Sequence, residues 1–144
     1  MEIKRLVEQL CFTYDTRDPF ELCRSFGIFT LRSPLIDIRG FYQREAGVSI
    51  IHIAEGLSEW EDRFVCAHEL GHCFLHPGLN RVFLDIGTLT ETSRLETDAD
   101  EFACRLLFGV PPELSGFELS YRQISECLNI PEDRVRERIE RLLK

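Results

Sequence analysis

The sequence predicts one α+β domain over residues 1–144, with helices packed on a short, mainly antiparallel sheet. Apolar residues recur at helical spacing in several segments, and two short runs rich in β-branched and aromatic residues lie between them. No repeat, low-complexity segment or linker divides the 144 residues, and a chain of this length can bury a core without disulfide bonds. We therefore predict a globular domain with one core.

Two short helices are predicted to open the chain. Residues 2–10 carry apolar side chains at helical spacing, in Ile3, Leu6, Val7 and Leu10. Asp18 followed by Pro19 is typical of the cap and first position of a second helix, which Gly27 would end.

Short strands are predicted next, in residues 29–43 (FTLRSPLIDIRGFYQ) and residues 48–54 (VSIIHIA). Both runs are rich in β-branched and aromatic residues, and the REAG segment between them predicts a hairpin or meander. VSIIHIA is apolar on both faces, so we expect this strand to lie inside the sheet.

Two longer helices are predicted in the middle of the chain. Ser58 and Glu61 form a capping-box pattern, so the first helix starts at residue 59 and continues until the Pro-Gly pair at 77–78. A short strand is possible in VFLDI, at residues 82–86. The second long helix is predicted over residues 92–108, before a Gly and a Pro-Pro pair end it.

Residues 120–144 are predicted to form a small two-helix segment packed on the domain. Two helices joined by a short turn are also typical of DNA-binding segments, so the charge of the segment decides between the two. Six basic residues against five acidic residues leave a net charge of only +1, which attracts phosphate weakly. The apolar residues of the segment are therefore expected to pack on the core or on a partner.

Composition excludes several classes of protein. The 25 acidic and 17 basic residues give a net charge of -8, which opposes a phosphate backbone and argues against nucleic acid as the main ligand. No run approaches the roughly 18 apolar residues of a membrane span, and MEIKRLVEQL lacks the apolar block of a signal peptide, so we expect a cytoplasmic protein without a membrane partner. The six cysteines contain no CxxC pair and are expected to be mainly small buried residues.

Residues 66–76, CAHELGHCFLH, place two histidines four residues apart with a glutamate directly after the first. On a helix, positions four apart differ by about 40° in direction and about 6 Å in height, so His68 and His72 can share one ion. Glu69 lies near enough to contact a water molecule on the open side of that ion, where a general base belongs. Chance could also produce the pattern, but these groups would be costly to bury among apolar neighbours without an ion or hydrogen bonds.

A catalytic zinc site needs a third protein ligand, and the helix LETDADEFACRLL offers candidates. Glu96 and Asp100 are four residues apart and share a face with alanines, which would let this helix approach the histidine helix closely. We expect Glu96 to bind the metal and Asp100 to accept a hydrogen bond from a ligand imidazole. Alternatively, both carboxylates belong to the solvated side of the helix, and Glu91 and Asp98 are the reserve ligands.

The segments AHELGHCFLH and ETDADEFACRLL together resemble the ImmA/IrrE family of zinc metallopeptidases, found in phages, mobile elements and bacterial stress regulation. DPFELCRSFGI, RGFY and ISECLNIPEDRVRERIERL are similar to further family segments, so the resemblance covers nearly the whole chain. Glu96, Ala99 and Asp100 meet the family's pattern in the second helix. One departure is His52, where the family more often has asparagine.

This resemblance implies a zincin-like fold and a gluzincin-type peptidase, with His68, His72 and Glu96 as zinc ligands and Glu69 as the base. Manganese is the other metal to consider. Zinc would lower the pKa of a bound water towards about 7, and Glu69 would take its proton. Family members typically cleave a helix-turn-helix repressor encoded beside them, which implies a protein substrate and relief of repression. The alternative function is a non-catalytic, zinc-containing regulator that binds a protein partner.

The residue that would stabilise an oxyanion cannot be chosen from the sequence. The candidates are His52, His76, Tyr42 and Tyr121. His76 could also compete as a metal ligand, but it falls at the end of the predicted helix beside a proline. A role at the helix end, or in support of a ligand, is therefore expected for His76.

Overall fold

A computed structural model of the chain describes residues 3–76, 89–108, 131–133 and 136. Helices and a small three-stranded sheet form an α+β fold in this part of the chain, which confirms the predicted class. The possible strand at 82–86 and most of the segment at 120–144 lie outside the described residues. The helices are α1 (Ile3–Tyr14), α2 (Pro19–Phe26), α3 (Glu59–Leu75) and α5 (Leu89–Phe108), and the strands are β1 (Phe29–Ser33), β2 (Gly40–Glu45) and β3 (Val48–Ala54).

The predicted helix ends agree with the structure where capping signals mark them. Asp18 caps α2 by accepting a hydrogen bond from the Phe20 backbone N–H at 2.9 Å, and Gly27 ends that helix in the left-handed conformation, with φ of 69°. Ser58 caps α3 by accepting from the Glu61 N–H at 3.1 Å. Local side-chain chemistry therefore specifies these ends.

Helix α1 is longer than predicted and continues to Tyr14. The Tyr14 ring packs on the Phe26 ring of α2, with 4.9 Å between centroids, so a tertiary contact stabilises the added turn. Helix α5 likewise begins at Leu89, before the predicted residue 92. Among the described residues, none of the helices combines the length and the apolar composition of a membrane span.

The sheet has the strand order β1-β3-β2, so β3 occupies the central position that its apolar sequence predicts. Strands β2 and β3 form an antiparallel hairpin through Ala46 and Gly47, whose φ angles of 52° and 80° suit a tight two-residue turn. Strand β1 pairs with β3 in parallel, so the sheet is mixed rather than mainly antiparallel. The parallel pair arises because the hairpin reverses the chain, which makes β3 run in the direction of β1.

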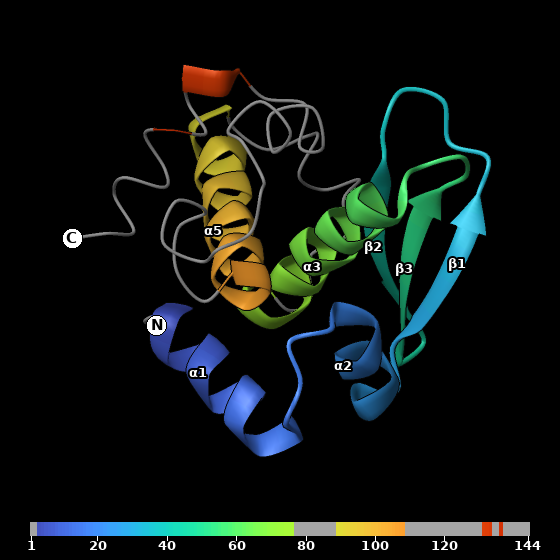
Figure 1. Cartoon of the computed structure of the whole chain (residues 1–144). Coiled ribbons are helices and arrows are strands. Elements are labelled where there is room, and N and C mark those ends of the chain that lie inside the picture. The colour runs from blue at the N-terminus through green and yellow to red at the C-terminus, as the bar shows by residue number, and fades with distance from the viewer. Residues whose placement is uncertain (1–2, 77–88, 109–130, 134–135, 137–144) are drawn as a thin grey trace.

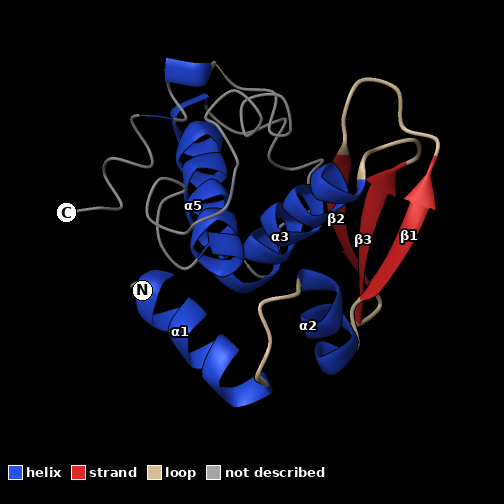
Figure 2. Cartoon of the chain, viewed as in Figure 1, coloured by secondary structure: helices blue, strands red, loops and turns tan. Residues whose placement is uncertain are grey.

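Helix α3 lies between the sheet and α5, as Figures 1 and 2 show, so it is covered on two sides. Ile51 and Ile53 of β3 are buried, and so are Phe64 and Leu70 of α3 and Phe102 of α5. The histidines and glutamate of residues 68–72 therefore lie in a helix with packed neighbours on both sides.

Close packing and backbone hydrogen bonds hold α5 against its neighbours. A Cβ atom added at Gly71 of α3 would lie 3.2 Å from the Ala99 Cα and 3.1 Å from the Phe102 Cβ, so the glycine permits a close crossing. Arg17, between α1 and α2, donates to the backbone carbonyls of Arg105 and Leu106 at 3.1 Å each. These carbonyls belong to the last turn of α5, where intrahelical partners are missing.

Replacement of Gly40 by alanine is expected to destabilise the protein by about 1–3 kcal/mol, a typical cost of overpacking. An added Cβ would lie 2.5 Å from Val65 Cγ1 and 2.8 Å from the backbone oxygen of His52, so β2 and α3 must separate. Urea unfolding measures the loss, with Glu45→Ala as a control at an exposed position of the same strand. An unchanged unfolding midpoint in Gly40→Ala would contradict this packing.

Candidate metal centre

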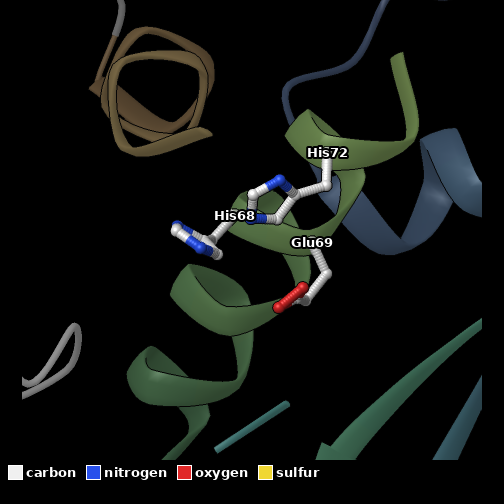
Figure 3. Close-up of side chains that lie close together, drawn as sticks. All are labelled: His68, Glu69 and His72. Atoms are coloured by element: carbon white, nitrogen blue, oxygen red, sulfur yellow. The ribbon is translucent and has the colours of Figure 1, made fainter. Parts of the chain in front are cut away.

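His68, Glu69 and His72 project from α3 into a common region, as Figure 3 shows. One potential ligand atom of each residue lies within 4.8 Å of those of the other two. The helix places the two imidazoles one turn apart, and their rings meet edge to face with centroids 4.9 Å apart. This part of the site follows from spacing within a single helix.

Helix α5 brings the Glu96 carboxylate to both histidines. Glu96 Oε2 lies 2.9 Å from His68 Nε2, and Glu96 Oε1 lies 3.0 Å from His72 Nε2. Burial alone would raise the pKa of this carboxyl, but its hydrogen bonds with the two imidazoles outweigh burial and hold the pKa well below its usual range. The carboxylate is therefore an anion that joins two imidazole nitrogens.

Glu69 is buried, with 2% of its surface exposed, at the junction of α3 and β2. A Cβ atom at Gly40, the first residue of β2, would come 3.6 Å from Glu69 Cγ. The close packing at Gly40 was not predicted from the sequence, although a glycine that opens a strand can indicate close approach of another backbone or side chain. At 3.6 Å such an atom would be in ordinary van der Waals contact with Glu69, and the contact that a side chain at position 40 would make too close is the one to Val65 Cγ1, at 2.5 Å.

Asp100 lies next to His68 on the side away from Glu96. Its Oδ1 atom is 2.9 Å from His68 Nδ1, and the residue is buried. The opposite nitrogen of the same ring faces Glu96, so a carboxylate lies at each end of the imidazole. The predicted role of Asp100, which is to accept a hydrogen bond from a ligand imidazole, stays a prediction that this position allows.

His76 caps the C-terminal end of α3, and its Nδ1 atom lies 3.0 Å from His72 Nδ1. His76 therefore contacts one nitrogen of the His72 ring, and Glu96 contacts the other nitrogen, Nε2. Asp98 was one of the reserve ligands. Its Oδ2 atom lies 3.6 Å from His76 Nε2, whereas the Nε2 atoms of His68 and His72 face Glu96. The side chain of Glu91, the other reserve ligand, lies outside the described residues.

His52 lies on the outer face of the sheet, away from α3. Its neighbours in β3, Ile51 and Ile53, are buried on the inner face, and successive side chains of a strand alternate between faces. The His52 ring stacks on Phe41 at 4.2 Å, while Ser33 and Gln43 hydrogen-bond its two nitrogens at 2.9 Å each. His52 therefore links all three strands and does not face the candidate metal centre on α3.

The two tyrosines that were candidates for stabilising an oxyanion, Tyr42 and Tyr121, are assigned no catalytic role. Tyr42 is buried, and its hydroxyl lies 3.3 Å from Ser49 Oγ. Tyr121 lies outside the described residues.

Acidification is expected to weaken the stabilisation that His52 provides. Burial lowers the pKa of the His52 imidazole below its usual value of 6.5, and its hydrogen-bond partners Ser33 and Gln43 are uncharged. The imidazole has a higher pKa in the unfolded state, so acid protonates the unfolded state more readily and favours unfolding. The stabilisation is therefore present above about pH 6.5 and is lost as the pH falls. Unfolding free energies of the parent and His52→Asn, measured from about pH 8 to about pH 5, should converge. A constant difference across that range would contradict the prediction.

The donor set fits a zinc ion. Two imidazole nitrogens and a carboxylate are the ligands of many catalytic zinc sites, and each imidazole here has a polar group at its other nitrogen. Within the described residues no cysteine belongs to the cluster of potential ligands around His68 and His72.

Three of the cysteines, Cys23, Cys66 and Cys104, are buried, as expected. Burial raises the pKa of the Cys104 thiol to about 12.

Comparison with known proteins identifies the family. A model of the peptidase family described as IrrE N-terminal-like domain matches residues 23–144. The chain is 38% identical over 106 residues to a protein of Bacillus phage phi105 named uncharacterized immunity region protein 2, covering 73% of this chain and 67% of that protein. It is 32% identical over 137 residues to metallopeptidase ImmA of Bacillus subtilis, covering 90% of this chain and 79% of that protein. With these matches over most of its length, the chain belongs to the ImmA/IrrE family.

Proposed function

We propose that this protein is a zinc-dependent metallo-endopeptidase that cleaves a helix-turn-helix transcriptional repressor in the cytoplasm and thereby relieves repression. The observation that carries the proposal is the Glu96 carboxylate, which joins the Nε2 atoms of His68 and His72 beside a buried Glu69. The names of the relatives, a metallopeptidase and a phage immunity region protein, support a protein substrate connected with immunity control.

In this proposal His68, His72 and Glu96 hold the metal. Bound zinc would polarise the carbonyl of the scissile peptide and lower the pKa of a water molecule, and manganese is the alternative ion. Asp100 would keep the Nε2 atom of His68 directed at the metal by accepting a hydrogen bond from Nδ1. In this proposal His68, His72 and Glu96 would bind the metal, and the Asp100 carboxylate would orient one of these ligands.

Glu69 would act as the general base and then as the general acid. It accepts a proton from the attacking water, the oxygen bonds to the peptide carbon, and the proton moves to the amine as the carbon–nitrogen bond breaks. Burial of Glu69 supports this role, because a carboxylate shielded from bulk water has a basicity that its surroundings can adjust.

The substrate could bind along the edge of the sheet. In the described part of the chain β2 pairs only with β3, so its other edge could pair with an extended peptide near Glu69.

The test is incubation of the zinc-loaded protein with the helix-turn-helix repressor encoded beside its gene. Intact-mass analysis should show two new fragments whose masses sum to the repressor plus one water. A sample stripped with a chelator should give no fragments, and restored zinc or manganese should show which metal supports cleavage. Stable association without fragments would overturn the peptidase proposal and favour a non-catalytic regulator that binds its partner.

A further inference from the structure

A chain of polar side chains continues from His72 away from Glu96. His72 Nδ1 lies 3.0 Å from His76 Nδ1, and His76 Nε2 lies 3.6 Å from Asp98 Oδ2. Both histidines are buried, whereas the Asp98 side chain is 35% exposed. The chain therefore runs from the proposed metal centre through His76 to a carboxylate near the surface.

Metal binding would determine the position of the proton in each ring of this chain. If His72 uses the lone pair of Nε2 for the metal, its proton must be on Nδ1, and that N–H can donate only to an acceptor. His76 Nδ1 is the acceptor in reach, so the proton of His76 must be on Nε2. That second N–H faces the Asp98 carboxylate.

The opposite proton arrangement would oppose metal binding. With its proton on Nδ1, His76 would donate to His72 Nδ1, and the His72 proton would then occupy the Nε2 position needed for the metal. His76 would also turn a lone pair towards the Asp98 carboxylate, which is electrostatically unfavourable. The charge of Asp98 therefore favours the arrangement that leaves His72 Nε2 ready for a metal.

We infer that His76 and Asp98 are positioning residues that hold His72 in its metal-binding tautomer. The inference rests on the proposed metal centre and adds two residues to it. Helix α5 would then orient both ligand imidazoles through carboxylates two positions apart: Asp100 contacts His68 directly, and Asp98 acts on His72 through His76. His76 is not a fourth ligand, because it meets His72 at the ring nitrogen opposite Glu96.

Two substitutions at His76 separate a hydrogen-bonding role from a packing role. His76→Phe keeps a ring but removes the acceptor, whereas His76→Asn retains an oxygen near the position of Nδ1. Zinc affinity, measured by competition with a chromophoric chelator, should fall about 10- to 100-fold in His76→Phe, the usual effect of losing a hydrogen-bond partner of a ligand. His76→Asn should recover most of that loss, and Asp98→Asn should weaken binding only a few-fold, since its contact is longer.

Nitrogen-15 NMR of the zinc-loaded protein gives a second readout. The parent should show a proton on His72 Nδ1 that exchanges slowly with water, and in His76→Phe that proton should exchange faster. Glu101→Gln serves as the α5 control, because Glu101 pairs with Arg105 and lies outside the polar chain. Thermal unfolding of the metal-free proteins establishes that each variant is folded before affinities are compared.

Parent zinc affinity in His76→Phe, or equal losses in His76→Phe and His76→Asn, would overturn the inference while leaving the metal centre intact. If His76→Phe does not fold, parent affinity in both Asp98→Asn and His76→Ala would overturn it instead. Failure of the parent protein to bind zinc would overturn the proposed metal centre itself, so the two failures are distinguishable.

Discussion

Replacement of Glu69 by glutamine is expected to lower repressor cleavage by about 10²- to 10⁴-fold, the usual contribution of a general base, while zinc remains bound. Glutamine keeps nearly the same shape, so the packing between α3 and β2 should survive. Its amide cannot take a proton from the attacking water, which removes the proposed step without removing a proposed ligand. Single-turnover cleavage and zinc content, measured on the same preparation, test both halves of the prediction.

Glu59→Gln is the matched control for Glu69→Gln. Glu59 lies in the first turn of the same helix, with 88% of its side chain exposed, and the change removes the same charge. The Glu59→Gln protein should cleave the repressor at the rate of the parent protein. Parent-rate cleavage by Glu69→Gln would show that Glu69 is not the base, whereas loss of both zinc and cleavage would indicate that it supports metal binding.

Replacement of Glu96 by alanine is expected to weaken zinc binding by more than about 100-fold, beyond the usual effect of losing an outer hydrogen-bond partner. The change removes the carboxylate that lies 2.9 Å from His68 Nε2 and 3.0 Å from His72 Nε2, and two imidazoles alone make an incomplete site. Mass spectrometry under native conditions, after dialysis against a weak chelator, should find one zinc per chain in the parent and none in the variant.

Glu101→Ala provides the control for Glu96→Ala, because it removes a carboxylate from the same helix that pairs with Arg105 instead. Its zinc content should equal that of the parent. Full zinc occupancy in Glu96→Ala would assign the third ligand elsewhere. Absence of zinc from every protein, after loading with excess zinc, would contradict the metallopeptidase proposal and favour a binding function for this member of the family.

Much of the fold could be predicted because its signals are local. Asp18, Gly27 and Ser58 mark helix ends through bonds to residues only a few positions away, and the structure has those ends where they were expected. The apolar character of both faces of VSIIHIA likewise predicts the central position of β3. Strand direction was not predictable from such signals, because the parallel pairing of β1 with β3 depends on the path of the whole chain.

The candidate site divides in the same way. The common direction of His68 and His72 follows from the pitch of one helix and needs no other part of the chain. The position of Glu96 was also expected, since the alanine-lined face of α5 predicts close approach, and Gly71 of α3 provides the matching surface. Their roles as ligands remain proposals that the zinc measurements test.

Local sequence thus determines the helix that carries the paired histidines, its ends, and the spacing of the potential metal ligands. Long-range packing decides which groups meet those ligands: it places Asp98 beside His76, and it turns His52 to the far face of the sheet. The physical reason is that a helix sets side-chain directions over a few residues, whereas these contacts join elements whose relative positions depend on burying a shared core.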